Sequence, residues 1–161
     1  MDNAIDVIDL LQRDHRMIEG LIEELERTDE PAEVRRVFFR IVEELAAHEA
    51  AEQEVVFPAF RAKIEAAGDS TIVHRMGEHE ELNELLAEMR CLAPNCFGFT
   101  KRGSALMLDI KAHFLNEEET VFARMREVLS PEYLVELGQR ALEAKQHSPA
   151  FTDDHPRLAD R

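Results

Sequence analysis

Two copies of one short pattern restrict the folds that this chain can adopt. HEAAEQEVVF spans residues 48–57, and HFLNEEETVF spans residues 113–122. In each copy a His is followed by a Glu at +4, a Val at +8 and a Phe at +9. Four residues of an α-helix advance about 400° and rise about 6 Å, so the His and the Glu project from one face. The pattern predicts two helices that each present a His and a Glu side by side.

A second repeated pattern precedes each copy. DHRMIEGLIEEL (residues 14–25) and EHEELNELLAEM (residues 78–89) both place an acid before a His, with apolar residues at +3, +6 and +7 from that His. The two halves of the chain therefore resemble each other. They predict two helical hairpins related by a pseudo-twofold axis, with four histidines on four different helices: His15, His48, His79 and His113.

Apolar residues recur at spacings of three and four through most of the chain, which predicts helices. Proline after a turn, and serines that can cap, mark where helices begin at Pro31, Ser70 and Ser130. The predicted helices cover residues 4–27, 31–67, 70–92, 100–129 and 130–147. Short loops between long helices predict an all-α fold, an up-down-up-down four-helix bundle with an additional C-terminal helix. We divide the chain into a bundle (1–129) that holds the site, an accessory helix (130–147) and a flexible tail (148–161).

The charge balance excludes several function classes. The chain has 19 Lys and Arg against 34 Asp and Glu, a formal net charge of −15. That charge repels phosphate backbones and anionic lipid surfaces, so we expect neither nucleic acid nor membrane as a partner. The acidic start, MDNAIDVIDLL, lacks the features of a secretory signal, and we expect a cytoplasmic protein.

The repeated histidines interrupt apolar stripes. Ile8, Leu11, His15, Ile18 and Ile22 follow one another at helical spacing, as do Met76, His79, Leu82 and Leu86. Imidazoles and carboxylates that face a core cost several kcal/mol when unpaired, and metal ligation removes that cost. Six ligands are too many for one tetrahedral zinc and suit two ions with bridging carboxylates. Mixed imidazole and carboxylate ligation favours iron, with manganese a poorer fit. The candidate ligands are His15, His48, Glu52, His79, His113 and Glu117.

The chain resembles the hemerythrin-like, or HHE cation-binding, domain family over residues 4–127. The similarity rests on the ordered set of DH at His15, HEAAEQEVVFP from His48, EH at His79 and HFLNEEETVF from His113. It implies an up-down four-helix bundle around two iron ions (Fe²⁺ or Fe³⁺, oxo- or hydroxo-bridged). It also implies that these ions bind, sense or handle dioxygen, nitric oxide or peroxide. It also implies that the six candidates are the ligands, with Glu52 and Glu117 as the bridging carboxylates.

Two departures separate this chain from the oxygen-carrying hemerythrins. Those proteins place a fifth His four residues before the position of His79, where this chain has Arg75. His74 lies one residue further back, about 140° around a straight helix, and only a bulge would bring it in. The second motif ends in Glu117, where the oxygen carriers have an Asp one residue later. Both differences favour the HHE branch over reversible oxygen carriage.

Four functions remain open at this point. The first is a di-iron domain that binds or senses dioxygen, nitric oxide or peroxide. The second is an enzyme that decomposes peroxide or reduces nitric oxide by the chemistry of the metal, since no catalytic side chains or organic cofactor motif are recognised. The third is iron storage or donation, and the fourth is a metal-free helical bundle for protein interaction. The redox partner and the oligomeric state stay open, with the last helix as a candidate homodimer contact.

Several residues near the candidate ligands carry narrower expectations. Phe57 and Phe122, at +9, fall about 180° from their His on an ideal helix, so they either pack on an outer contact or follow an irregular turn. Asp14 and Glu78 point about 100° away from the adjacent His and should not bind metal directly. We expect Glu118 to accept a hydrogen bond from a ligand imidazole. We expect the remaining flanking acids to be solvated: Glu49, Glu54 and Glu119. Three apolar residues should shield the site from water: Ile18, Leu82 and Met76. We expect exposed histidines at His147 and His155, and reduced thiols at Cys91 and Cys96.

Overall fold

The computed structural model describes residues 5–64, 71–90, 92 and 97–148 of the 161-residue chain. Within these residues there is no strand, and the helices form five rods. The rods are α1 (Val7–Glu26), the continuous α2–η1–α3 (Pro31–Ala51, Glu52–Val56, Phe57–Lys63), α4 (Thr71–Arg90), the continuous α5–η2–α6 (Phe97–Glu117, Glu118–Phe122, Ala123–Val128) and α7 (Pro131–Gln146). The predicted all-α bundle is confirmed.

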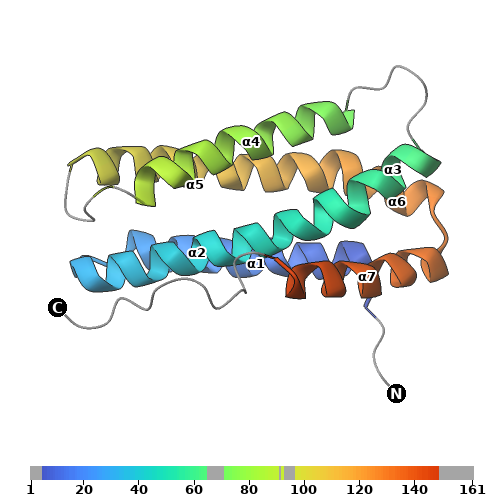
Figure 1. Ribbon diagram of the computed structural model, residues 1–161, viewed down its shortest axis with the longest axis horizontal. Coiled ribbons are helices and arrows are strands. Elements are labelled where there is room, and N and C mark those ends of the chain that lie inside the picture. Colours follow the sequence, from blue (N-terminus) through green and yellow to red (C-terminus); the bar gives the residue numbers. More distant parts are fainter. Residues whose placement is uncertain (1–4, 65–70, 91, 93–96, 149–161) are drawn as a thin grey trace.

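The four long rods run along the long axis of the molecule, with α4 and α5 forming one layer and α1 and α2 the other (Figure 1). The shorter α7 lies beside the second layer and packs against α1, α2 and η1. The core has two apolar clusters. One is centred on α7, α1 and the two irregular turns, and includes Leu137, Phe57 and Phe122. The other lies toward the opposite end of the long rods and includes Phe38, Ile41 and Phe114.

Ser130 caps α7 as the sequence predicted, whereas α1 begins at Val7, later than the predicted residue 4, with Asp6 as its cap. The predicted cap Ser70 lies outside the described residues. The Asp6 carboxylate accepts a hydrogen bond from the Asp9 backbone N–H, and Ser130 Oγ accepts one from Tyr133. Pro31 and Pro131 lie in the first turns of α2 and α7. The second predicted helix ends earlier than expected, at Lys63. The fourth begins at Phe97, earlier than the predicted residue 100, so that Gly98 lies in the first turn of α5.

Two π-helical turns interrupt the long rods at equivalent places, directly after each His-to-Glu pair. They cover Glu52–Val56 and Glu118–Phe122. A π turn closes i→i+5 bonds and so inserts about one residue, which turns the following side chains back by roughly 100°. Phe57 and Phe122 are therefore brought inward, and each is only 2% exposed. Of the two alternatives, the irregular turn is the one observed.

Close packing of α7 on the start of α1 gives the first testable prediction. A Cβ on Gly138 would overlap the Ile5 carbonyl oxygen and lie 3.1 Å from Val7 N. We expect Gly138→Ala to lower the free energy of unfolding by about 1–3 kcal/mol, measured by chemical denaturation. Gly20→Ala is the matched control, because a Cβ there meets nothing within 4 Å. It should raise stability by about 0.5–1 kcal/mol. Equal effects of the two substitutions would contradict the observed packing of α7.

Candidate metal centre

All six side chains singled out in the sequence converge on one buried point. They come from four rods: His15 from α1, His48 and Glu52 from α2–η1, His79 from α4, and His113 and Glu117 from α5. Five of them are 0% exposed, and His113 is 5% exposed. The helical spacing explains the convergence, since each His-to-Glu pair occupies one face and each face turns toward the bundle axis.

Glu117 lies between two pairs of imidazoles. Its Oε1 is 3.2 Å from His113 Nε2 and 3.6 Å from His79 Nε2. Its Oε2 is 3.5 Å from His15 Nε2 and 3.9 Å from His48 Nε2. Within each pair the Nε2 atoms face each other, at 3.0 Å for His79 and His113 and 3.3 Å for His15 and His48. The Glu117 carboxylate therefore faces two separate pairs of imidazole nitrogen atoms, one pair with each of its oxygens.

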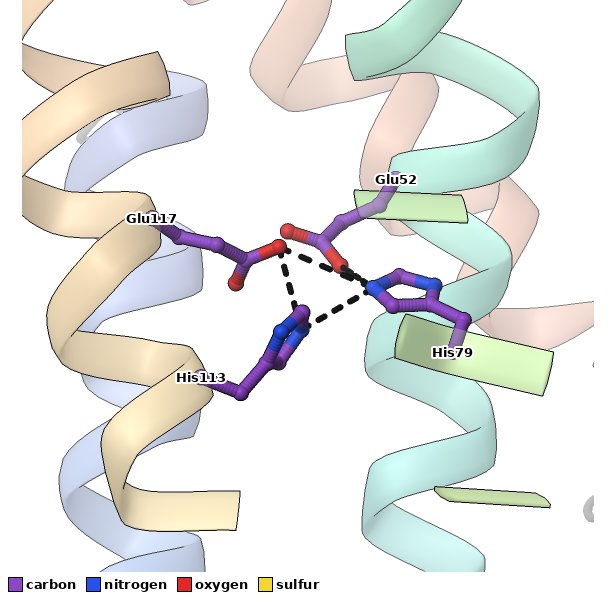
Figure 2. A group of neighbouring side chains, drawn as sticks. All are labelled: Glu52, His79, His113 and Glu117. Atoms are coloured by element: carbon purple, nitrogen blue, oxygen red, sulfur yellow. Dashed lines mark hydrogen bonds and ion pairs between the residues drawn. The ribbon is translucent and has the colours of Figure 1, made fainter. Parts of the chain in front are cut away.

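Glu52 also lies between two imidazoles, one from each pair. Its Oε2 lies 3.2 Å from His79 Nε2 and 3.4 Å from His48 Nε2. Figure 2 shows Glu52, His79, His113 and Glu117 pointing toward one another from three rods. The atoms form two groups suited to a metal ion, Glu52, His79, His113 and Glu117 in one and His15, His48 and Glu117 in the other. The shared member is Glu117.

These distances agree with ligation of metal ions. Neighbouring ligands of an ion with bonds of about 2.1 Å lie about 3 Å apart when they meet at right angles. Neither oxygen of Glu52 or Glu117 accepts a hydrogen bond from the described residues, although all four atoms are buried. Such carboxylates are costly to bury unless a cation compensates them. The donor set and its unsatisfied oxygens therefore fit a pair of transition-metal ions.

The comparisons with known proteins agree with this geometry. The family model of the hemerythrin HHE cation binding domain matches residues 6–125. The chain belongs to this family. An HHE cation-binding domain-containing protein from Mycobacterium kansasii, known from a crystal structure, superposes with a TM-score of 0.77. The match covers 88% of this chain and 86% of that one at 20% identity, and it supports the fold alone.

Two curated relatives show how far the similarity extends. A protein of Nostoc sp. named DNA nickase is 30% identical over 128 residues, which are 80% of this chain and 36% of that protein. This HHE chain therefore spans about a third of the Nostoc protein. An uncharacterized hemerythrin-like protein of Schizosaccharomyces pombe is 23% identical over 150 residues, 93% of this chain and 73% of that protein.

Acids on neighbouring rods accept hydrogen bonds from two imidazoles of the HHE domain, and a third acid lies close to His48. His15 Nδ1 donates to Glu118 at 2.8 Å, as the sequence predicted. His113 Nδ1 donates to Glu78 at 2.9 Å, and His48 Nδ1 lies 3.5 Å from Asp14. An acceptor on Nδ1 fixes the ring so that Nε2 faces the centre. Sequence reasoning correctly kept Asp14 and Glu78 out of the two groups. It missed that each supports the His of the adjacent rod.

His79 has a different environment. Its Nδ1 has no hydrogen-bond partner among the described residues. The nearby Glu49 is 6% exposed, and its Oε2 accepts from Asn83 at 2.7 Å while Oε1 accepts none. Burial raises the pKa of Glu49, against the opposing charge of His79 and the Asn83 hydrogen bond. The expectation that Glu49 is a solvated acid was wrong, since residue 49 turns inward beside His48. Glu54 and Glu119 are exposed as expected.

The carboxylates hold protons on the imidazoles when no metal is present. Burial lowers the pKa of His48, but Glu52, Asp14 and Glu117 outweigh it and raise the pKa to about 10. Burial also lowers the pKa of His79, but Glu117 and Glu52 outweigh it and raise the pKa to about 11. The pKa of Glu117 is held well below its usual value despite complete burial, because four imidazoles surround it. Metal ions would replace these protons as the compensating positive charge.

Aromatic rings close much of the space around the centre. Phe114 stacks on His15 with centroids 4.0 Å apart, and Phe122 stacks on the same ring at 5.6 Å. Phe57 lies 5.4 Å from His79. The predicted shielding by Ile18 and Leu82 agrees with their burial, but Met76 is 37% exposed and lies against Arg61 instead. The π turns, which bring both motif phenylalanines inward, account for part of this wall.

The remaining sequence candidates lie outside the centre. The His74 side chain is 68% exposed and pairs with Glu78 at 3.2 Å, so the helix is regular here and His74 is no candidate ligand. His147 is exposed. Cys91, Cys96 and His155 fall outside the described residues. Within the described part of the chain, no helix has the length and apolar character that crossing a membrane requires.

Proposed function

We propose that this HHE domain holds two iron ions and uses them to bind a small ligand, namely dioxygen, nitric oxide or peroxide. The observation that carries the proposal is the position of Glu117, whose two oxygens face two different pairs of imidazoles. A carboxylate in that position can bridge two ions. The membership of a cation-binding family supports the same interpretation.

Iron fits the donor set better than the other common metals. His79, His113 and the two carboxylates would hold one ion, and His15, His48 and Glu117 the other. Zinc prefers four ligands and is not redox-active, and calcium and magnesium prefer oxygen. When bound, two iron ions would supply reversible electron exchange with the ligand. The protein orients the imidazoles through Glu118, Glu78 and Asp14, and it excludes water with Phe57, Phe114 and Phe122.

We do not extend the proposal to DNA. The name DNA nickase belongs to the Nostoc protein, of which this chain matches 36%. The formal net charge of −15 opposes approach to a phosphate backbone. We propose a small molecule as the ligand, with neither nucleic acid nor membrane as a partner.

Metal analysis of a ligand variant tests the proposal. Protein loaded with ferrous iron under anaerobic conditions, without an affinity tag, should contain about two irons per chain. His113→Ala should lose most of the iron held by the group of Glu52, His79, His113 and Glu117, because His113 supplies one of the two imidazoles of that group. The matched control is His74→Ala, which removes an exposed imidazole and should keep the full content. A His113→Ala protein with full iron would contradict the assignment.

Binding and turnover are separated on the same loaded protein. We expect nitric oxide and dioxygen to change its absorbance at a stoichiometry of about one ligand per pair of irons. Sustained consumption of hydrogen peroxide or nitric oxide would instead indicate an enzyme.

A further inference from the structure

One groove on the described surface reaches a member of the candidate centre. It has a volume of about 230 Å³ and lies between α4 and α5. Its walls are partly apolar and partly acidic, and the lining residues are Glu78, Glu81, Leu82, Leu85, Asp109, Ala112, His113 and Asn116. His113 is also the one candidate ligand with any exposed surface, 5% against 0% for the other five. The groove therefore borders the least buried of the candidate ligands.

Among the described residues, other side chains pack against His15, His48 and His79. Phe114 and Phe122 stack on His15. The Phe114 ring also lies 5.5 Å from His48, edge-on. Behind His48, Asp14 accepts a hydrogen bond from Lys145 of α7, so the additional helix seals that side. Phe57 covers His79.

We propose that a small uncharged ligand enters along the α4–α5 groove and reaches the ion held by His79 and His113, rather than the ion held by His15 and His48. This inference rests on the proposed function, since it needs a metal at that position. The volume admits several molecules the size of water, which occupy about 30 Å³ each, so a diatomic molecule or hydrogen peroxide fits.

The rim of the groove selects by charge. Glu78, Glu81 and Asp109 line it. Glu78 is fixed there by His113 and His74, at 2.9 Å and 3.2 Å. A concave surface lined by one sign of charge repels ions of that sign and slows their association. The groove therefore favours neutral ligands over anions such as azide or nitrite.

A steric plug tests the route. Ala112 lines the groove and is exposed, so Ala112→Phe should fill it without disturbing the core. Ala105→Phe is the matched control, because Ala105 is also exposed and lies two turns away on the same face of α5, outside the groove. In stopped-flow measurements on the ferrous protein, Ala112→Phe should slow the association of nitric oxide about tenfold or more. Ala105→Phe should leave the rate unchanged, and both variants should keep the iron content of the parent protein.

A charge variant gives a second readout. Glu81→Gln combined with Asp109→Asn should accelerate the association of azide with the ferric protein several-fold, while nitric oxide association with the ferrous protein stays within twofold. Equal nitric oxide rates in Ala112→Phe and Ala105→Phe, at equal iron content, would overturn the groove as the entrance. A parent protein that binds no iron, or that binds iron but none of nitric oxide, dioxygen and peroxide, would instead overturn the proposed function. The two failures are therefore distinguishable.

Discussion

Replacing Glu117 with glutamine is expected to remove both metal ions rather than one. The carboxylate places Oε1 toward His79 and His113 and Oε2 toward His15 and His48, so each ion would share it. Glutamine keeps the shape but loses the negative charge that both ions would share: its amide nitrogen donates and does not ligate, and its one remaining oxygen is a neutral, weaker ligand. Loss of a group that merely supports a ligand costs about 10–100-fold in affinity, so loss of a shared ligand should cost at least about 100-fold.

Elemental analysis after anaerobic loading measures this directly. Glu117→Gln should retain little iron. Glu52→Gln should retain about one ion per chain, because Glu52 belongs to the His79 group and His15, His48 and Glu117 stay intact. Glu119→Gln is the control, since it removes an exposed acid two residues away and should keep the full content. Retention of one tightly bound iron by Glu117→Gln would show that the ions do not share this carboxylate.

The six candidate ligands could be found from the sequence because helical geometry is local. A His and a Glu four residues apart must share a face, whatever the rest of the chain does. Polar residues within apolar stripes must face the core, where they need compensation. The internal repeat then placed the four histidines on four helices. Each of these steps uses short-range spacing, and the structure brings all six side chains together.

The surroundings of the centre depend on contacts between helices, and the sequence predicted them less well. Glu78 supports His113, and Asp14 approaches His48, across an interface that no spacing rule specifies. The only local signal was that an acid precedes a His in both halves. Glu49 was assigned to solvent as one of the acids that flank the candidate ligands, yet it is buried and accepts a hydrogen bond from Asn83.

The π turns show a different limit. An ideal helix places Phe57 and Phe122 opposite the ligands, whereas both rings are buried in the core near the centre. The inserted residue that reverses their direction has no signature in composition. The signal in the sequence was that Phe57 and Phe122, which are apolar, recur at an offset from their His where a regular helix would expose them. From the sequence an outer contact and an irregular turn both stayed open, and the structure shows the irregular turn.

The centre is asymmetric in its surroundings, although the sequence repeat relates its two pairs of histidines. The His15 and His48 side is covered by stacked phenylalanines and, through Lys145 and Asp14, by α7. The His79 and His113 side borders the groove between α4 and α5. On the route that we propose, α7 would help to direct a ligand to the His79 and His113 side.

Removal of the metal is expected to lower the thermal stability of the protein. The metal-free protein is also expected to take up protons. A metal held at about 1,000 times its dissociation constant contributes about 4 kcal/mol to the folded state. In a chain of this size each kcal/mol changes the melting temperature by about 2–4 °C, so a chelator should lower it by about 8–16 °C. Readdition of ferrous iron should restore the melting temperature, measured by circular dichroism. In Glu117→Gln the chelator should have little effect.

Proton uptake follows from the raised pKa values of two imidazoles. Metal-bound imidazoles are neutral, whereas in the metal-free protein His48 and His79, with pKa values of about 10 and 11, carry protons at pH 7. Removal of metal should therefore take up about two protons per chain at pH 7, and acidification should weaken metal binding. The same raised pKa values stabilise the metal-free fold fully below pH 6.5, the ordinary histidine value, and that stability is lost as the pH rises toward 10. Chelation in weakly buffered solution with a pH indicator measures the uptake. After subtraction of the protons that the chelator itself releases on binding free ferrous iron, net release of protons would contradict the assignment of these histidines as ligands.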